Sequence, residues 1–194
     1  MQRCSWAGAT PEYIRYHDEE WGRPVVDDNR LYEKLCLEGF QSGLSWLTVL
    51  KKRPQFRKQF RNFDAIKVAK MTRPDVELLL EDAGIIRHRG KIESTINNAR
   101  RVLEVGKEFG SFAAYIWSFE PESRGGPMTA AMIVSETEAS RALSKDLRKR
   151  GFSFVGPTTC HAFMQAMGLV NDHVDDCFCR AECESERKKL QRPK

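Results

Sequence analysis

Apolar residues of this 194-residue chain recur at helical spacing, and residues typical of helix starts stand between the apolar segments. Thr10 followed by Pro11 is an N-cap before a first-turn proline, and Ser45, Asp64 and Ser111 occupy similar starts. No convincing strand alternation and no internal repeat is visible. The pattern predicts helices over residues 11–20, 46–53, 65–71, 75–83, 91–110, 112–119, 138–150 and 158–168.

Several helix boundaries follow from single residues. Asp28 is predicted to cap a helix that places Leu31, Leu35 and Glu38 on one face. Pro54 is predicted to end the helix that Ser45 opens, because proline removes a backbone donor.

Two further boundaries complete the assignment. Gly84 is predicted to cap the helix over 75–83 in the left-handed conformation, and the longest helix is predicted to end at Gly110. Residues 120–134 are predicted to form a loop. Together these elements predict an all-α fold in one domain over residues 1–194.

Composition places the chain among ordinary globular proteins, with 41% hydrophobic and 30% charged residues. No apolar run approaches the ~20 residues that a membrane-spanning helix needs, and the first residues lack the apolar stretch of a signal peptide. We therefore expect a cytoplasmic protein with no membrane partner, and we expect it to be monomeric.

The formal net charge of +5 weakly favours a polyanion as partner. Residues 185–194 contribute five basic and one acidic residue, so the tail supplies +4 and the remaining chain +1. The composition of residues 184–194 leaves disorder open. Three internal basic segments, 51–61, 87–91 and 148–150, are either phosphate-binding patches or solvated helix faces.

Histidine and cysteine residues near both ends of the chain have the chemistry of a metal site. Two from each end make a Cys₂His₂ set, which suits a closed, structural tetrahedral zinc site: Cys4, His17, His173 and Cys177. Such a site would join the two ends of the chain. Spacing alone leaves a competing thiol cluster open, which adds to Cys177 the thiols of Cys179 and Cys183.

Aromatic residues crowd the first quarter of the sequence, and an acidic residue lies among them. The aromatic residues are Trp6, Tyr13, Tyr16, Trp21 and Trp46. Glu38 shares a helix face with leucines, and a buried carboxylate without a partner is costly. It is either neutralised by a salt bridge or a backbone cap, or held between aromatic planes for a cationic or hydrogen-bonding ligand such as a flipped nucleobase.

Two turns have the features of DNA-contacting loops. In "FSFVGPTT" (152–159) a Gly-Pro turn opens a helix, and the exposed amides at Gly156, Thr158 and Thr159 suit a phosphate. The segment resembles the hairpin of helix-hairpin-helix DNA repair glycosylases, although a plain helix–turn–helix corner is the alternative. In "QSGLSW" (41–46), Gly43 and Leu44 form a turn whose leucine either packs normally or wedges into a base stack.

Longer segments carry a family resemblance that covers nearly the whole chain. The sequence resembles the bacterial 3-methyladenine DNA glycosylase I family in "RCSW" (3–6), "YHDEEWG" (16–22), "LCLEGFQSGLSWLTVLKKR" (35–53), "FD" (63–64), "EDAGIIRHRGKI" (81–92), "YIWSF" (115–119), "LSKDLRKRGFSFVGPTT" (143–159) and "FMQAMGLVNDHVDDC" (163–177). Little of 120–134 matches a family motif, and the basic tail after Cys183 is not part of the family signature.

The resemblance implies a helix-hairpin-helix glycosylase fold and a hydrolase that excises 3-methyladenine from alkylated double-stranded DNA, the first step of base excision repair. It implies a structural zinc held by Cys4, His17, His173 and Cys177, rather than by Cys179 and Cys183. It also implies a base pocket in which Tyr16 and Glu38 act on the base and Trp46 stacks, with Trp6, Tyr13 and Trp21 close by.

The resemblance also bears on the chemistry at the hairpin. The position that carries a lysine in glycosylases with lyase activity falls near Thr158, so no lyase step is expected. Asp172 and Asp176 lie beside the expected zinc ligands, and we do not expect them to reach the sugar. The competing hypothesis is a non-catalytic, zinc-stabilised helical module that binds DNA.

Overall fold

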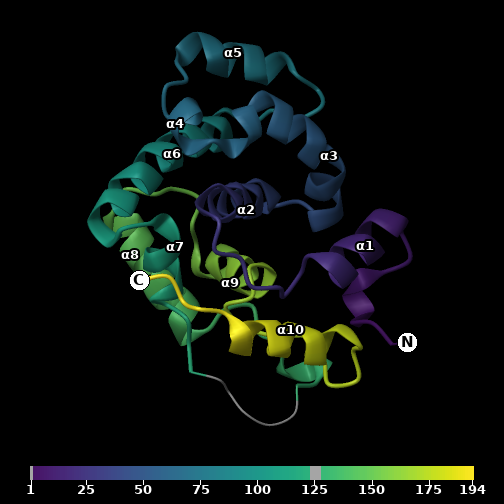
Figure 1. The fold of residues 1–194 in the computed structure, drawn as a ribbon. Helices are drawn as coiled ribbons and strands as arrows, with labels where there is room; N and C mark the ends of the chain where they lie inside the picture. The colour runs from purple at the N-terminus through teal and green to yellow at the C-terminus, as the bar shows by residue number, and fades with distance from the viewer. Residues whose placement is uncertain (1, 123–127) are drawn as a thin grey trace.

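The computed structural model describes residues 2–122 and 128–194, in which helices joined by turns and loops form the regular secondary structure (Figure 1). Within these ranges the only β pairing is an isolated bridge between Gln2 and Cys177. The same ranges contain no helix that is long and apolar enough to cross a membrane. The predicted all-α class is confirmed, whereas residues 123–127 of the predicted loop lie outside the described part of the chain.

Ten α-helices and three short 3₁₀ helices make up the described chain. The α-helices are α1 (Pro11–Glu19), α2 (Asp28–Gln41), α3 (Trp46–Gln59), α4 (Ala65–Val68), α5 (Arg73–Glu81), α6 (Arg89–Phe109), α7 (Phe112–Trp117), α8 (Glu138–Lys149), α9 (Pro157–Ala166) and α10 (Cys179–Lys189). The 3₁₀ helices are Ser5–Ala7, Arg61–Phe63 and Ala130–Met132.

Helix α2 lies at the centre of the molecule, with other helices on every side (Figure 1). It packs against α3, α6, α7 and α9, and every residue from Leu31 to Phe40 is buried. The face predicted from the sequence, with Leu31, Leu35 and Glu38, is therefore only part of the buried surface of α2. Because no side of α2 between these residues faces water, its charged side chains must find partners inside the protein.

The start of α2 differs by one residue from the prediction, and the difference links two helices. Asp27 is the N-cap, since its side chain accepts from Arg30 N at 2.8 Å. Asp28 instead accepts hydrogen bonds from Phe112 N at 3.1 Å and Ala113 N at 2.8 Å, the first amides of α7. The first turn of a helix leaves its amides without intrahelical partners, so Asp28 supplies an acceptor across the fold.

Two predicted helix ends are wrong. Helix α3 continues through Pro54 to Gln59, because one missing backbone hydrogen bond is offset when Phe56 packs into the core. Helix α5 ends at Glu81, and Gly84 has no left-handed φ angle. A Cβ at Gly84 would meet Gln55 Cγ at 2.5 Å, so close packing rather than a turn requires this glycine. The predicted end at Gly110 is confirmed by a φ angle of 85°, and Gly151, directly after the helix predicted over 138–150, likewise has a φ angle of 83°.

The first part of the basic tail is helical in this structure. Residues through Lys189 belong to α10, which runs along one side of the molecule from the region of the N-terminus (Figure 1). Arg187 and Arg192 both bind Glu120, at 3.0 and 2.7 Å. Two of the tail's five cations are thus paired within the fold.

The bonds from Asp28 to α7 predict a stability change. Replacement of Asp28 by alanine leaves two amides at the start of α7 without their acceptor, and we expect the free energy of unfolding to fall by about 1–3 kcal/mol. Urea denaturation followed by circular dichroism measures it. Glu81→Ala, at an exposed site, removes the same charge as a control; equal stabilities of the two variants would contradict the predicted role.

Candidate active site and metal centre

The five aromatic residues singled out in the sequence meet Glu38 around one cavity of about 170 Å³. Its lining residues are Trp6, Tyr13, Tyr16, Trp21, Glu38, Gln41, Trp46, Ile133, Ala162 and Gln165. The cavity is small beside the ~300–1,000 Å³ of pockets for drug-sized ligands, and this favours a compact, planar occupant. Residues that lie far apart in sequence, from α1, α2, α3 and α9, thus form one site.

Aromatic rings form a continuous wall around this cavity. The ring centroid of Trp6 lies 5.4 Å from that of Tyr13 and 4.8 Å from that of Trp21. The Tyr16 and Trp46 centroids are 5.3 Å apart. Tilted and edge-on contacts of this kind are the favoured arrangements of aromatic pairs, so the rings support one another.

Glu38 has a partner that the sequence analysis missed, namely Lys34. The ammonium of Lys34, one turn earlier on α2, lies 2.8 Å from Glu38 Oε1. The two residues are only 4% and 5% exposed. The salt-bridge alternative for Glu38 is therefore correct, yet Glu38 also lines the cavity, so the two alternatives hold together. The i, i+4 spacing in "KLCLE" was the available signal.

Lys34 contacts the other predicted base-binding residues as well. Its Nζ donates to Tyr16 Oη at 2.6 Å and lies 3.4 Å from the ring centroid of Trp46. Burial lowers the pKa of the Lys34 ammonium, while Glu38 acts in the opposite direction. Burial also raises the pKa of the Tyr16 hydroxyl, with a further contribution from Glu38, so Tyr16 is a neutral donor and acceptor.

Helix α9 contributes a polar side chain, Gln165, to the cavity wall, and a hydrogen bond to Asp172 holds this side chain in place. Gln165 lines the cavity and donates from Nε2 to Asp172 Oδ2 at 2.8 Å. Asp172 Oδ2 also lies 3.6 Å from His161 Nε2. Asp172 is buried and accepts this hydrogen bond, so it supports Gln165 in the wall of the cavity.

Another wall comes from the segment that follows the undescribed residues. Ile133, next to the 3₁₀ helix Ala130–Met132, lines the cavity. The sequence analysis assigned no role to this residue, because residues 120–134 carry no motif that would have identified it.

The predicted wedge lies beside the cavity, at the C-terminal end of α2. Leu44 is 44% exposed, and Gly43 has a φ angle of 79° with open space around it. Lys91 Nζ donates to Phe40 O at 2.9 Å and Ser42 O at 2.6 Å, which fixes the base of this turn. The structure therefore presents Leu44 to solvent on a supported turn.

Helices α8 and α9 pack together and are joined by the segment 150–156. Gly156 is the N-cap of α9, Thr158 is exposed and Thr159 is partly exposed. Asn98 on α6 fixes this turn, since it donates to Ser153 O and accepts from Ser153 N, both at 3.0 Å. The predicted phosphate-binding positions thus lie at the surface on a firmly held turn.

Many residues of the three basic segments are committed to intramolecular partners. Arg53 binds Glu20, Arg57 binds Glu33, and Arg89 binds Glu77. Lys91 is buried, as described above, and Arg150 binds Glu108 and Asp146. The interpretation of these segments as solvated helix faces is therefore incomplete, since five of their cations have partners within the protein.

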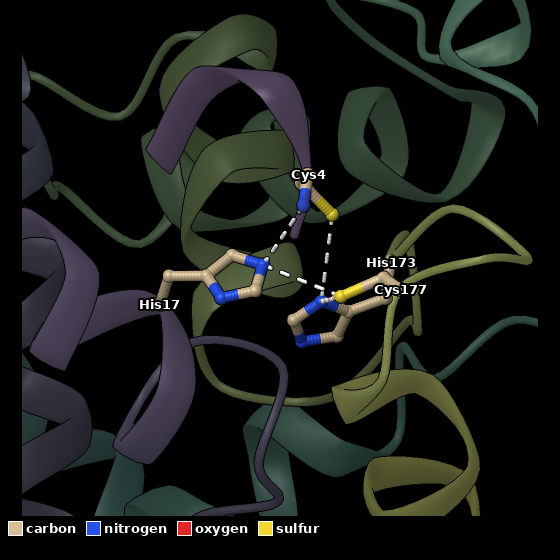
Figure 2. A group of neighbouring side chains, drawn as sticks. All are labelled: Cys4, His17, His173 and Cys177. Atoms are coloured by element: carbon tan, nitrogen blue, oxygen red, sulfur yellow. Dashed lines mark hydrogen bonds between the residues drawn. The ribbon is translucent and has the colours of Figure 1, made fainter. Parts of the chain in front are cut away.

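The four predicted metal ligands form a buried cluster that faces a common centre (Figure 2). Cys177 Sγ lies 3.3 Å from His173 Nδ1 and 3.5 Å from His17 Nε2, and Cys4 Sγ lies 3.6 Å from His173 Nδ1. All four potential ligand atoms lie within 4.8 Å of one another. Tetrahedral bonds of about 2.3 Å to sulfur and 2.0–2.1 Å to nitrogen place such atoms about 3.5 Å apart, so the cluster fits a metal ion.

Both histidines are held through their other ring nitrogen. His17 Nδ1 lies 2.8 Å from Asp18 Oδ1, and His173 Nε2 lies 3.0 Å from Trp21 O. Outer partners of this kind fix the tautomer and the ring orientation of metal-binding histidines. Asp18 was not recognised from the sequence, although it follows His17 directly.

The competing thiols do not join the four-residue cluster. Cys179 Sγ lies 3.9 Å from His17 Nδ1, on the far side of the ring, in a second group with His17 and Asp18. Cys183 Sγ lies 4.0 Å from Trp21 O.

Burial shifts the pKa values of two of the four ligands. It raises the pKa of the Cys4 thiol to about 12 and lowers the pKa of His173 to about 4. A bound cation would offset the cost of a buried Cys4 thiolate.

The cluster joins the parts of the chain that the sequence predicted, through the same four residues. It links the N-terminal segment to residues 173–177, and Phe178 N donates to Gln2 O at 3.2 Å. The C-terminal residue itself lies near Gly110, at the end of α6. Its backbone oxygen, Lys194 O, is 3.5 Å from where a Cβ on Gly110 would stand. The predicted link between the N-terminal segment and the C-terminal segment at residues 173–177 is therefore confirmed, while the last residues of the chain lie away from the cluster.

Comparison with known proteins gives consistent relatives. The family model for methyladenine glycosylases matches residues 6–180. DNA-3-methyladenine glycosylase 1 of Escherichia coli K12 is 53% identical over 182 residues, which are 92% of this chain and 97% of that protein. DNA-3-methyladenine glycosylase of Haemophilus influenzae is 50% identical over 181 residues, again 92% and 97% of the two chains.

Solved structures agree with these relatives. A crystal structure of a 3-methyladenine DNA glycosylase I matches with a TM-score of 0.88 and 51% identity, over 92% of this chain and 100% of that one. The Staphylococcus aureus enzyme, whose structure addresses 3-methyladenine recognition, matches with a TM-score of 0.86 and 36% identity, over 93% and 97%. The chain therefore belongs to the methyladenine glycosylase family.

Proposed function

We propose that this protein is a DNA-3-methyladenine glycosylase, a hydrolase that cleaves the N-glycosidic bond of 3-methyladenine in alkylated double-stranded DNA. The observation that carries the proposal is the aromatic cavity with the Glu38 carboxylate in its wall. The family assignment supports it, as do relatives named for this activity and one related structure in complex with 3-methyladenine.

The chemistry of the pocket suits the edge of adenine. Lys34 has only donors, so Tyr16 Oη accepts from it and keeps its own proton for another acceptor. Glu38 Oε1 binds Lys34, which leaves the second carboxylate oxygen for a donor. An adenine presents an N7 acceptor beside its N6 amino donors, so Tyr16 would donate to N7 and Glu38 would accept from N6.

The reaction itself needs little acid–base assistance. 3-Methyladenine is cationic in DNA and already a good leaving group, so binding energy can serve selection and the extrahelical position of the base. Trp46 would stack on the base, and Leu44 would fill the gap that the base leaves in the duplex. The turn at Gly156, Thr158 and Thr159 would act as the hairpin of a helix-hairpin-helix element and hold the DNA backbone.

The competing function is a helical module that binds DNA without catalysis. It accounts for the exposed turn between α8 and α9, but it gives no reason for a carboxylate and five aromatic residues around one cavity. Release of free base from methylated DNA separates the two. We further propose that the enzyme is a cytoplasmic monomer without a lyase step, since Thr158 stands where a Schiff-base lysine would be needed.

We propose zinc as the ion of the Cys₂His₂ cluster. Two thiolates and two imidazoles are a typical donor set for structural zinc, and four protein ligands leave no open position for a reacting water. Zinc would supply a cross-link between the N-terminal segment and residues 173–177. It takes no part in the proposed cleavage.

Loss of one zinc ligand tests this assignment. We expect Cys177→Ser to lower zinc content and melting temperature together, because metal-binding energy contributes to folding. Metal analysis and thermal unfolding measure both quantities, and Cys36→Ser, another buried cysteine outside the cluster, is the control. A wild-type protein purified without zinc would refute the assignment.

Phosphate contacts predict a strong dependence on salt. Affinity for undamaged duplex should fall steeply with ionic strength and be the same for different sequences, because the hairpin would bind the backbone alone. Fluorescence anisotropy at several salt concentrations measures this. Truncation after Lys189 removes two of the tail's cations, Arg192 and Lys194, and should leave most of the affinity; a flat salt dependence would contradict the prediction.

The role of Glu38 predicts a catalytic defect without a folding defect. Glu38→Gln keeps the shape but replaces a charged acceptor, and hydrogen bonds to charged groups contribute roughly 1.5–3 kcal/mol. Excision should therefore slow by about ten- to a hundredfold, with zinc content unchanged. Chromatography of base released from methylated DNA measures the rate, and a denaturing gel checks that the strand stays intact. A wild-type rate would remove Glu38 from the site.

A further inference from the structure

The charge of the base pocket is set by two residues rather than by Glu38 alone. Lys34 and Glu38 form a buried pair 2.8 Å apart, and both lie in the region of the cavity. The next charges outward, Glu20 and Arg53, bind each other with two contacts of 2.6 and 2.7 Å. The empty pocket is therefore electrically balanced, although its wall contains a carboxylate.

The Lys34 ammonium makes three contacts with residues of the pocket. It binds Glu38, it binds Tyr16, and it also lies over the ring of Trp46, 3.4 Å from the ring centroid. Lys34 does not itself line the cavity; it lies behind the three residues that would bind the base. A cation so placed repels a cationic base in front of it, while it holds Glu38 and Tyr16 in position.

We propose that Lys34 is a specificity-determining residue: as an internal counter-ion to Glu38, it lowers the preference of this pocket for a cationic base over a neutral one. The inference rests on the proposed function and refines it. With Lys34 in place, attraction of a cationic base to Glu38 is largely cancelled. A neutral base with the same N6 and N7 edge should then bind nearly as well.

The test compares two duplexes of equal shape and different charge. One contains 3-methyladenine, which is cationic, and the other contains 3-deaza-3-methyladenine, in which carbon replaces the ring nitrogen N3 and the base is neutral. For the neutral duplex, which is not cleaved, the dissociation constant is measured. For the cationic duplex, the half-saturation concentration is measured in single-turnover excision. The charge preference is the first value divided by the second. A general loss of pocket structure weakens both duplexes and leaves this ratio unchanged.

Four proteins give the pocket four combinations of charge. Wild type and the double variant Lys34→Met/Glu38→Gln have a net charge of zero, Lys34→Met has a negative pocket, and Glu38→Gln has a positive one. We expect Lys34→Met to raise the charge preference about tenfold and Glu38→Gln to lower it by a similar factor, while the double variant returns close to wild type. Lys107→Met, exposed on α6, makes the same charge change elsewhere and should have no effect.

The outcomes are separable. Equal preferences in wild type and Lys34→Met, or in Glu38→Gln and the double variant, would overturn the role of Lys34. If Lys34→Met does not fold, the second comparison decides alone, because the double variant removes the buried pair as a unit. A wild-type protein that releases no 3-methyladenine would refute the proposed function itself, whereas normal release with unchanged preferences would refute only the inference on Lys34.

Discussion

Burial of helix α2 from Leu31 to Phe40 is the constraint on which the rest of the structure depends. A helix with neighbours on every side cannot leave a charge without a partner, because the desolvation of an unpaired charge exceeds what packing supplies. Glu38 is therefore tied to Lys34, and Glu33 to Arg57. The same burial places Glu38 in the wall of a small cavity, so one requirement of folding also provides a carboxylate for a ligand.

The metal cluster and the cavity share backbone, which couples their geometry. Tyr16 lines the cavity and the next residue, His17, belongs to the cluster. Trp21 also lines the cavity, and its carbonyl oxygen holds His173. A metal ion bound between Cys4 and His17 would hold the segment 4–17 in place. This segment carries three aromatic residues of the cavity wall, Trp6, Tyr13 and Tyr16, so the ion would shape the cavity without taking part in a reaction.

Contacts between residues that are distant in sequence also determine what several cations of the basic segments do. Net charge and clustering indicated phosphate contacts, yet Arg53, Arg89 and Arg150 bind acidic residues of other elements. Lys91 supports the turn that presents Leu44. Cations near a nucleic-acid surface can therefore act indirectly, as supports for the loops that would contact the DNA.

Local chemistry determined much of the fold. The helix starts after Ser45, Asp64 and Ser111 depend on side-chain capping bonds within a few residues, and Gly110 supplies a positive φ angle at the end of α6, so the sequence alone located them. Thr10 makes no such bond, and the start of α1 depends instead on Pro11 in the first turn. Family motifs likewise identified the residues that meet at the cavity and at the metal cluster. Helix α10 was missed because its polar pattern resembles that of a disordered tail.

What only the tertiary structure decided are the pairings across the fold. Asp28 caps α7 and not α2, Gly84 serves close packing with α3, and Pro54 is tolerated because Phe56 is buried. Lys34 had the spacing to reach Glu38, but the sequence could not show that the same ammonium also meets Tyr16 and Trp46 from two other helices. The sequence determines contacts that span one or two helical turns; those between helices depend on how the whole chain packs, and they set the charge of the site.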